Sequence, residues 1–164
     1  MKFSTTTLLF LFVGLVFNAC KKDDDPDTPA VTQILPGVGI TGIKIGEPAQ
    51  QAIDLYGTVA PSFGGVGGQY THFLTYFTKG VIVYCEASAS DTFSPTMNVE
   101  SINLQAPFDG KTTSGIGIGS TKTAVEAAFG APVSSSAFFG DTFSNGLTVV
   151  YNDAGTVVEE ITVE

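Results

Sequence analysis

The chain has 164 residues, of which 16 are Asp or Glu and seven are Lys, and its formal net charge is −9. A surface this acidic repels phosphate groups, so we expect it to bind neither nucleic acid nor nucleotides. One histidine and two cysteines are too few for the usual zinc ligand sets. We therefore predict no metal and no cofactor.

The N-terminus has the pattern of an export signal. Met1 and Lys2 precede an apolar run over residues 8–17, which corresponds to a charged start followed by an apolar segment. This run is too short for a membrane-spanning helix, which takes about 20 residues. We predict that residues 1–19 form a signal peptide that is removed.

The residues around Cys20 favour a lipid anchor. Residues 17–20, Phe-Asn-Ala-Cys, resemble a bacterial lipobox, although Phe17 stands where Leu is usual. The resemblance implies that Cys20 is acylated and becomes the first residue of the mature chain, which several acyl chains would hold stably in a membrane. The alternative is an ordinary signal peptide that ends near Ala19, followed by a chance cysteine.

A block of charge follows Cys20 directly, and it consists of Lys21, Lys22, Asp23, Asp24 and Asp25. It resembles the signal that sends Bacteroidetes lipoproteins to the outer cell surface. The resemblance implies an outer-membrane protein anchored by lipid that faces the cell exterior. Residues 20–34 are charged and contain prolines, so we predict a flexible tether there.

The rest of the chain contains an internal repeat with an offset of 73 residues. Residues 42–46, Gly-Ile-Lys-Ile-Gly, match residues 115–119, Gly-Ile-Gly-Ile-Gly. A repeat of this kind indicates one supersecondary unit used twice. We predict repeat 1 over residues 35–106 and repeat 2 over residues 107–164, together forming a single domain.

Each repeat is predicted to contain one short helix, over residues 47–56 and 120–129. Gly57 and Gly130 follow the two segments and suit helix ends. Pro48 is favourable in the first turn of a helix, and Ser120 is a good N-cap. The apolar positions that the two segments share form a stripe that can pack on a sheet.

Strands follow each helix. They are predicted over residues 70–77, 81–86 and 99–104 in repeat 1, and over residues 138–143, 147–151 and 158–163 in repeat 2. Three-residue loops before Val81 and Leu147 would pair these residues with Phe77 and Phe143. The predicted fold class is α+β, in which two repeats of a short helix and antiparallel strands form one continuous sheet with the helices on one face.

The predicted register decides which side chains face the helices, because a slip of one residue exchanges the faces. It places Phe73, Phe77 and Cys85 beneath the helices. The opposite face then carries a candidate protein-binding surface, with Tyr70, His72, Tyr76, Ile82, Tyr84 and Phe138 as its residues, and with Leu74 and Val150 beside them. Tyrosine is enriched where proteins bind partners. The alternatives are that these residues merely favour strands, or that the loop over residues 88–97 covers them.

The two repeats over residues 37–164 resemble the tandem-repeat fold of the β-lactamase inhibitory protein family. Residues 118–132 are also similar to the helix motif of the small outer-membrane assembly lipoproteins of the same superfamily, with Gly119, Val125, Gly130 and Pro132 at matching places. The chain departs from the inhibitor family in having no disulfide pair within a repeat and one helix per repeat instead of two.

Catalysis is not predicted. Cys85 and His72 are the one available nucleophilic pair, and the register places them on opposite faces. Asp141 and Glu160 could approach one another on the open face. The leading hypothesis is a non-catalytic, surface-displayed protein-binding module. Its alternatives are an inhibitor of a secreted or host enzyme and a periplasmic accessory of outer-membrane assembly.

Overall fold

A computed structural model describes residues 32–66, 69–88 and 92–164, which belong to one compact unit, Val31–Glu164. The predicted signal peptide, the lipidation site Cys20 and the charge block from Lys21 to Asp25 lie outside the described residues. Within the described residues no helix has the length and apolar character needed to cross a membrane.

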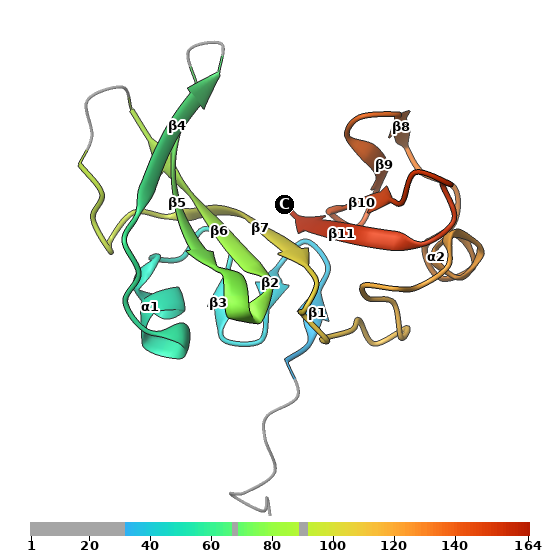
Figure 1. Ribbon diagram of the computed structural model, residues 1–164, viewed down its shortest axis with the longest axis horizontal. Coiled ribbons are helices and arrows are strands. Elements are labelled where there is room, and N and C mark those ends of the chain that lie inside the picture. The colour runs from blue at the N-terminus through green and yellow to red at the C-terminus, as the bar shows by residue number, and fades with distance from the viewer. Residues whose placement is uncertain (1–31, 67–68, 89–91) are drawn as a thin grey trace, which may run out of the picture. The chain divides into compact units, whose positions relative to one another are not determined.

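The unit consists mostly of antiparallel strands together with two α-helices, so the predicted α+β class is confirmed (Figure 1). A small sheet contains β1 (Ile34–Leu35), β2 (Gly39–Ile40) and β3 (Ile43–Lys44). The large sheet has the strand order β4-β5-β6-β7-β11-β10-β9-β8, and its members are β4 (Ser62–Val66), β5 (Gln69–Tyr76), β6 (Val81–Ala87), β7 (Val99–Gln105), β8 (Ser134–Ser136), β9 (Gly140–Phe143), β10 (Leu147–Tyr151) and β11 (Val158–Val163).

The helices are shorter than predicted at their N-termini. Helix α1 covers Gln50–Tyr56 and α2 covers Lys122–Phe129. The N-cap of α2 is Thr121, whose hydroxyl accepts from the amide of Ala124 at 3.2 Å. The predicted cap, Ser120, instead accepts from the amide of Gly117 at 3.0 Å. Each helix ends before a glycine with positive φ, as its sequence predicts.

The two hairpins differ in loop length. Phe143 pairs with Leu147 as predicted, and Gly146 in the loop between them has φ +77°. The predicted pairing of Phe77 with Val81 is wrong, because Tyr76 pairs with Val81. Phe77–Lys79 form a 3₁₀ turn, η1, which ends at Gly80 in the left-handed conformation. This extra loop residue shifts the whole of β5 by one position relative to β6.

Side chains from both sheets and both helices form one core. The small sheet contributes Ile34, Ile40 and Ile43 to this core, and each of these side chains is fully buried. Tyr56 of α1 contacts Tyr76 of β5, with 5.2 Å between the ring centroids. Phe129 of α2 contacts Phe143 of β9 at 5.8 Å. These contacts fix the position of each helix on the large sheet.

Similar backbone contacts occur before each helix, at positions 73 residues apart. The amide of Gly46 donates to the carbonyl of Val99 at 2.8 Å, and the amide of Gly119 donates to the carbonyl of Val158 at 2.8 Å. In return, Val99 donates to Glu47 and Val158 donates to Ser120, at 2.9 Å each. In both halves, therefore, the chain just before the helix is tied to the start of the strand that lies at the middle of the large sheet.

Candidate binding surface of the sheet

The shift in β5 separates the residues of the predicted binding face. Tyr70, His72 and Tyr76 of β5 lie on the same face of the sheet as the buried Leu74. Ile82 and Tyr84 of β6 lie on the opposite face. His72 is 5% exposed and Tyr76 is 4% exposed. The predicted face assignment of β5 is therefore wrong, because η1 takes up one more residue than the expected loop.

Phe138 is not on the sheet surface either. It precedes β9, in the turn after β8, and is 88% exposed. The predicted neighbour Val150 does lie on the side opposite the core, where it pairs with Glu160. The predicted faces of β6 and β10 are correct, because the residues expected in the core, Val81, Val83, Cys85, Leu147 and Val149, are buried.

On the side of the large sheet that faces away from the core, five half-buried side chains surround the buried Asn103. We call this group the open sheet surface, and its residues are Phe73, Ile82, Tyr84, Asn103, Glu160 and Thr162. The rings of Phe73 and Tyr84, on neighbouring strands, are 5.9 Å apart between centroids. Phe73 was expected beneath the helices, so it replaces His72 and Tyr76 among the aromatic residues of this surface.

A polar network lies beside these rings. The amide nitrogen of Asn103 donates to a carboxylate oxygen of Glu160 and to the hydroxyl of Thr162, the latter at 3.1 Å. Burial and then the charge of Glu160 raise the pKa of the Tyr84 hydroxyl. The hydroxyl therefore stays protonated at neutral pH and can donate or accept a hydrogen bond.

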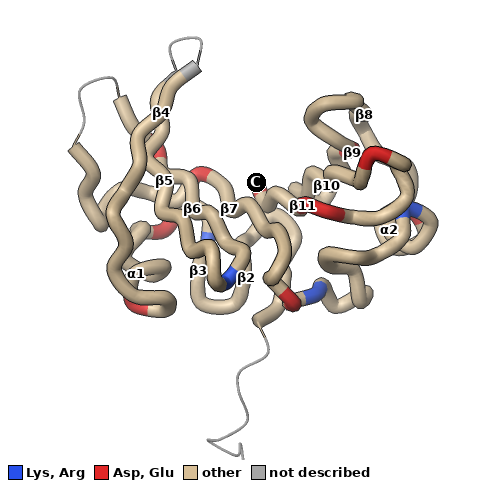
Figure 2. The backbone as a smooth tube through the Cα atoms, viewed as in Figure 1, with Lys and Arg blue, Asp and Glu red and all other residues tan. Residues whose placement is uncertain are grey.

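The open side of the sheet is acidic. Glu86, Glu100 and Glu160 lie on β6, β7 and β11 (Figure 2). The carboxylate of Glu100 accepts from the hydroxyl of Thr71 on β5, at 3.4 Å. Lysines in the described residues lie elsewhere, in β3, η1, the loop after β7 and α2. This distribution favours partners with positive charge.

Asp141 does not join Glu160. It pairs with the buried Val149 on the core side of β9, where Lys122 of α2 forms an ion pair with it at 2.8 Å and the hydroxyl of Ser135 donates to it at 2.7 Å. Burial alone would raise the pKa of Asp141, but the hydrogen bonds from Lys122 and Ser135 and the charge of Lys122 hold it below its usual value. The two carboxylates therefore have separate environments.

His72 and Cys85, expected on opposite faces, are directly paired across β5 and β6. Cys85 is fully buried, and burial together with the charge of Glu100 raises its pKa to about 11. A thiol with this pKa is protonated at neutral pH and is a poor nucleophile. The pairing thus brings the two side chains to one site without activating the sulfur.

A stack of aromatic rings at the edge of the sheet was not predicted. Phe63 of β4 lies parallel to Tyr70 of β5, with 5.8 Å between centroids, and is 4.8 Å from the ring of His72. His72 in turn contacts Phe93 at 5.8 Å. Residues 62–66, Ser-Phe-Gly-Gly-Val, have too little alternation to reveal a strand, so the sequence gives no signal for this stack.

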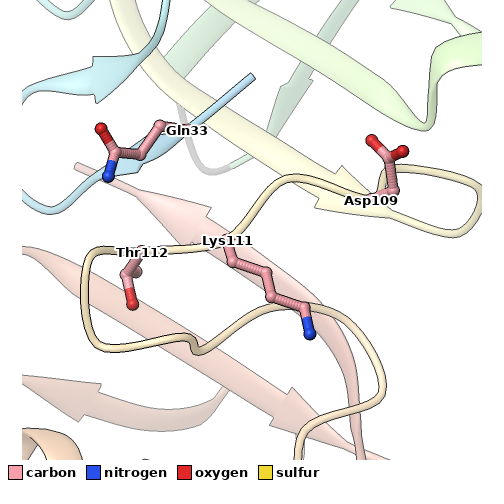
Figure 3. Close-up of a pocket in the computed structure, with 4 residues that line it drawn as sticks. All are labelled: Gln33, Asp109, Lys111 and Thr112. Carbon is pink, nitrogen blue, oxygen red and sulfur yellow. The ribbon is translucent and has the colours of Figure 1, made fainter. Parts of the chain in front are cut away.

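The described residues contain no group of three or more His, Cys, Asp or Glu side chains that could hold a metal ion. One hollow of about 380 Å³ is lined by Gln33, Asp109, Lys111 and Thr112 (Figure 3). Its two charged groups point in different directions rather than toward a common centre. The hollow therefore offers no convergent set of ligands.

No protein-family model matches the chain, and no curated protein and no solved structure matches it.

Proposed function

We propose that this protein is a non-catalytic, lipid-anchored protein of the outer membrane that faces the cell exterior and binds another protein through the open sheet surface. The observation that carries the proposal is the pair Phe73 and Tyr84 beside the network of Asn103, Glu160 and Thr162. Aromatic rings next to hydrogen-bonding groups are typical of interface centres.

The anchor is supported by the sequence alone. Cys20 follows an apolar export signal and precedes two lysines and three aspartates. A tether between the lipid and the sheet would let the open sheet surface reach a partner away from the membrane. This arrangement suits a binding module better than an enzyme, and the raised pKa of Cys85 fits the same interpretation.

We propose further that the two halves of the unit are copies of one repeat, with both helices on the same face of the large sheet. The hydrogen bonds from Gly46 to Val99 and from Gly119 to Val158 support a shared architecture. The contacts of Tyr56 with Tyr76 and of Phe129 with Phe143 support a common face. The register joins Tyr76 through Val81, Leu104 and Ile161 to Val149, and Phe143 pairs with Leu147, which lies two residues before Val149 on the same side of β10.

A second candidate is an inhibitor of a secreted or host enzyme. The continuous strand order β5-β6-β7-β11-β10 favours it, because this order spreads the aromatic and polar groups over one surface wide enough to cover an active site. The remaining alternative, an accessory of outer-membrane assembly, would require the periplasmic side of the membrane. Protease treatment of intact cells distinguishes it, since a periplasmic protein would be protected.

The test is crosslinking on intact cells followed by affinity capture of the full chain. We expect Tyr84→Ala to lose most of the captured partner, with a weakening of roughly 1 to 3 kcal/mol as for interface anchors. Tyr84→Phe should retain more binding, since it keeps the ring. Leu55→Ala is the matched control, because Leu55 is exposed on α1 and lies away from the open sheet surface. Unchanged capture by Tyr84→Ala would contradict the proposal.

A further inference from the structure

The free edge of β4 differs from the other edge of the large sheet. β4 is the terminal strand and pairs with β5 alone, and its five residues, Ser62–Val66, include neither charge nor proline. The opposite edge, β8, has only three residues. A proline precedes each edge strand, Pro61 before β4 and Pro132 before β8. Proteins commonly protect edges by shortness, charge or proline, and within β4 itself none of these protections is present.

The two sides of β4 are chemically different. On the core side, Phe63 is 48% exposed and lies on Tyr70, which pairs with Gly65. Because Gly65 has no side chain, the ring of Tyr70 can lean over it onto Phe63. The result is an apolar surface next to the free edge.

On the open side, Gly64 pairs with Thr71, and Thr71 pairs with Glu86 in the same row. The carboxylate of Glu100 also reaches the hydroxyl of Thr71. Since Gly64 carries no side chain, nothing on β4 in this row separates the free edge from these carboxylates. A long side chain on an added strand can therefore extend over Gly64 toward them, along the ring of Phe73, whose Cε1 lies 3.5 Å from the position that a Cβ of Gly64 would take.

From these features we infer that β4 accepts an extended segment of a partner protein as an additional strand, with a Lys or Arg facing Gly64 and apolar residues facing Phe63. The inference rests on the proposed protein-binding role and adds a second contact region with a defined chemistry. Backbone hydrogen bonds would supply affinity, while the alternation of side chains would supply specificity. A second copy of this chain is the less suitable occupant, because two chains of net charge −9 repel each other.

The experiment measures binding of a labelled peptide, Thr-Val-Thr-Val-Lys-Val-Thr-Val-Thr, to the full chain by fluorescence anisotropy. Its central Lys and its Val residues fall on opposite sides when it is extended. We expect saturable binding that weakens at least about tenfold when the Lys is replaced by Glu, because charge complementarity becomes repulsion. Glu100→Gln should weaken the Lys peptide and leave a Gln-centred peptide unaffected.

Variants of the two edges complete the test. Gly64→Val should abolish peptide binding, and the fold should tolerate it, since a Cβ at Gly64 makes an ordinary contact of 3.5 Å with Phe73 and its φ is not in the left-handed region. Ser134→Val, on β8, should change nothing. The inference is overturned if the Lys peptide does not bind, if the Glu peptide binds equally, or if Ser134→Val acts like Gly64→Val. It is also overturned if the chain forms a dimer that Gly64→Val disrupts.

The experiments distinguish a failure of the proposed function from a failure of this inference. Loss of captured partner in Tyr84→Ala with intact peptide binding would support both, because the peptide does not need the ring of Tyr84. Peptide binding at β4 together with unchanged capture by Tyr84→Ala would contradict the proposal that the open sheet surface is the main interface, and it would support the inference about β4.

Discussion

The ring of Tyr76 packs against the ring of Tyr56 at 5.2 Å, joining β5 to α1, while the next residue in the chain, Phe77, is 77% exposed in η1. Adjacent aromatic residues therefore have opposite roles. Tyr76 closes the core beneath the first helix, and Phe77 begins the turn that sets the register of β5 and β6.

This contrast gives the first prediction. Tyr76→Ala should destabilise the fold by roughly 3 to 5 kcal/mol, as expected when a buried aromatic ring leaves a cavity. Phe77→Ala should change stability by about 0.5 kcal/mol or less, because an exposed ring loses few contacts. Urea unfolding of both variants measures the difference, and equal destabilisation would show that Phe77 also packs in the core.

A second prediction concerns the hydroxyl of Tyr76, which is buried and forms no hydrogen bond with any of the described residues. Tyr76→Phe should leave stability unchanged or raise it by up to about 1 kcal/mol, since it removes a polar group that gains nothing from burial. The same urea experiment measures this change. A loss above about 1 kcal/mol would mean that the hydroxyl has a hydrogen-bond partner in solution.

The third prediction follows from the pKa of Cys85, which burial raises to about 11. An unfolded thiol ionises near pH 8.5. The contribution of the neutral, buried thiol is complete below that pH and is lost as pH rises toward 11. Stability should therefore fall over this alkaline range less steeply in Cys85→Ala than in the native protein. Native Cys85 should also react slowly with thiol reagents and become reactive on unfolding.

Much of the fold could be predicted because local chemistry determined it. Gly57 and Gly130 mark the helix ends, and the bounds predicted for β10 and β11 are those that the structure has. The register of β5 could not be predicted, because residues 78–80 and 144–146 both suit a three-residue loop. In the structure Tyr76, rather than Phe77, packs against Tyr56, and Phe77 enters η1; sequence periodicity does not distinguish these two adjacent aromatic residues.

The residues of the candidate site were likewise predicted only in part. Tyr84 and Ile82 were placed correctly because β6 alternates without interruption. His72 and Tyr76 were misplaced along with the register of β5, and Phe73 was missed for the same reason. The strand β4 was not predicted, because two glycines among its five residues are more typical of a loop than of a strand.

A fourth prediction tests the turn that sets this register. Gly80 has φ +64°, and a Cβ there would collide with the carbonyl oxygen of Gln105. Gly80→Ala should therefore destabilise the protein by more than the roughly 1 kcal/mol that left-handed strain alone costs. Gly115→Ala is the control, because Gly115 has φ +80° with nothing within 4 Å of an added Cβ. Equal effects in thermal unfolding would mean that the loop after β7 moves away from η1.

The last prediction concerns the ion pair of Lys122 and Asp141, which ties the start of α2 to β9 at 2.8 Å. Although burial alone would raise it, the pKa of Asp141 is held below its usual value by hydrogen bonds from Lys122 and Ser135 and by the charge of Lys122. A depressed pKa in the folded state means that the carboxylate contributes stability above the unfolded pKa, about 3.9. This contribution is lost as pH falls through the folded pKa. Lys122→Met should cost about 1 kcal/mol at pH 7, a modest value because the Lys122 side chain is partly exposed.

The same variant should lose less stability than the native protein on acidification, so the two stabilities should converge as the pH falls through the folded pKa of Asp141 and the carboxyl becomes protonated in both states. Lys79→Met provides the control, because Lys79 is exposed in η1 and forms no ion pair among the described residues. Its stability should follow that of the native protein at every pH. If the difference in stability between Lys122→Met and the native protein stayed constant throughout acidification, Lys122 would stabilise α2 through its contact with the ring of Tyr151, 4.9 Å away, rather than through the charge of Asp141.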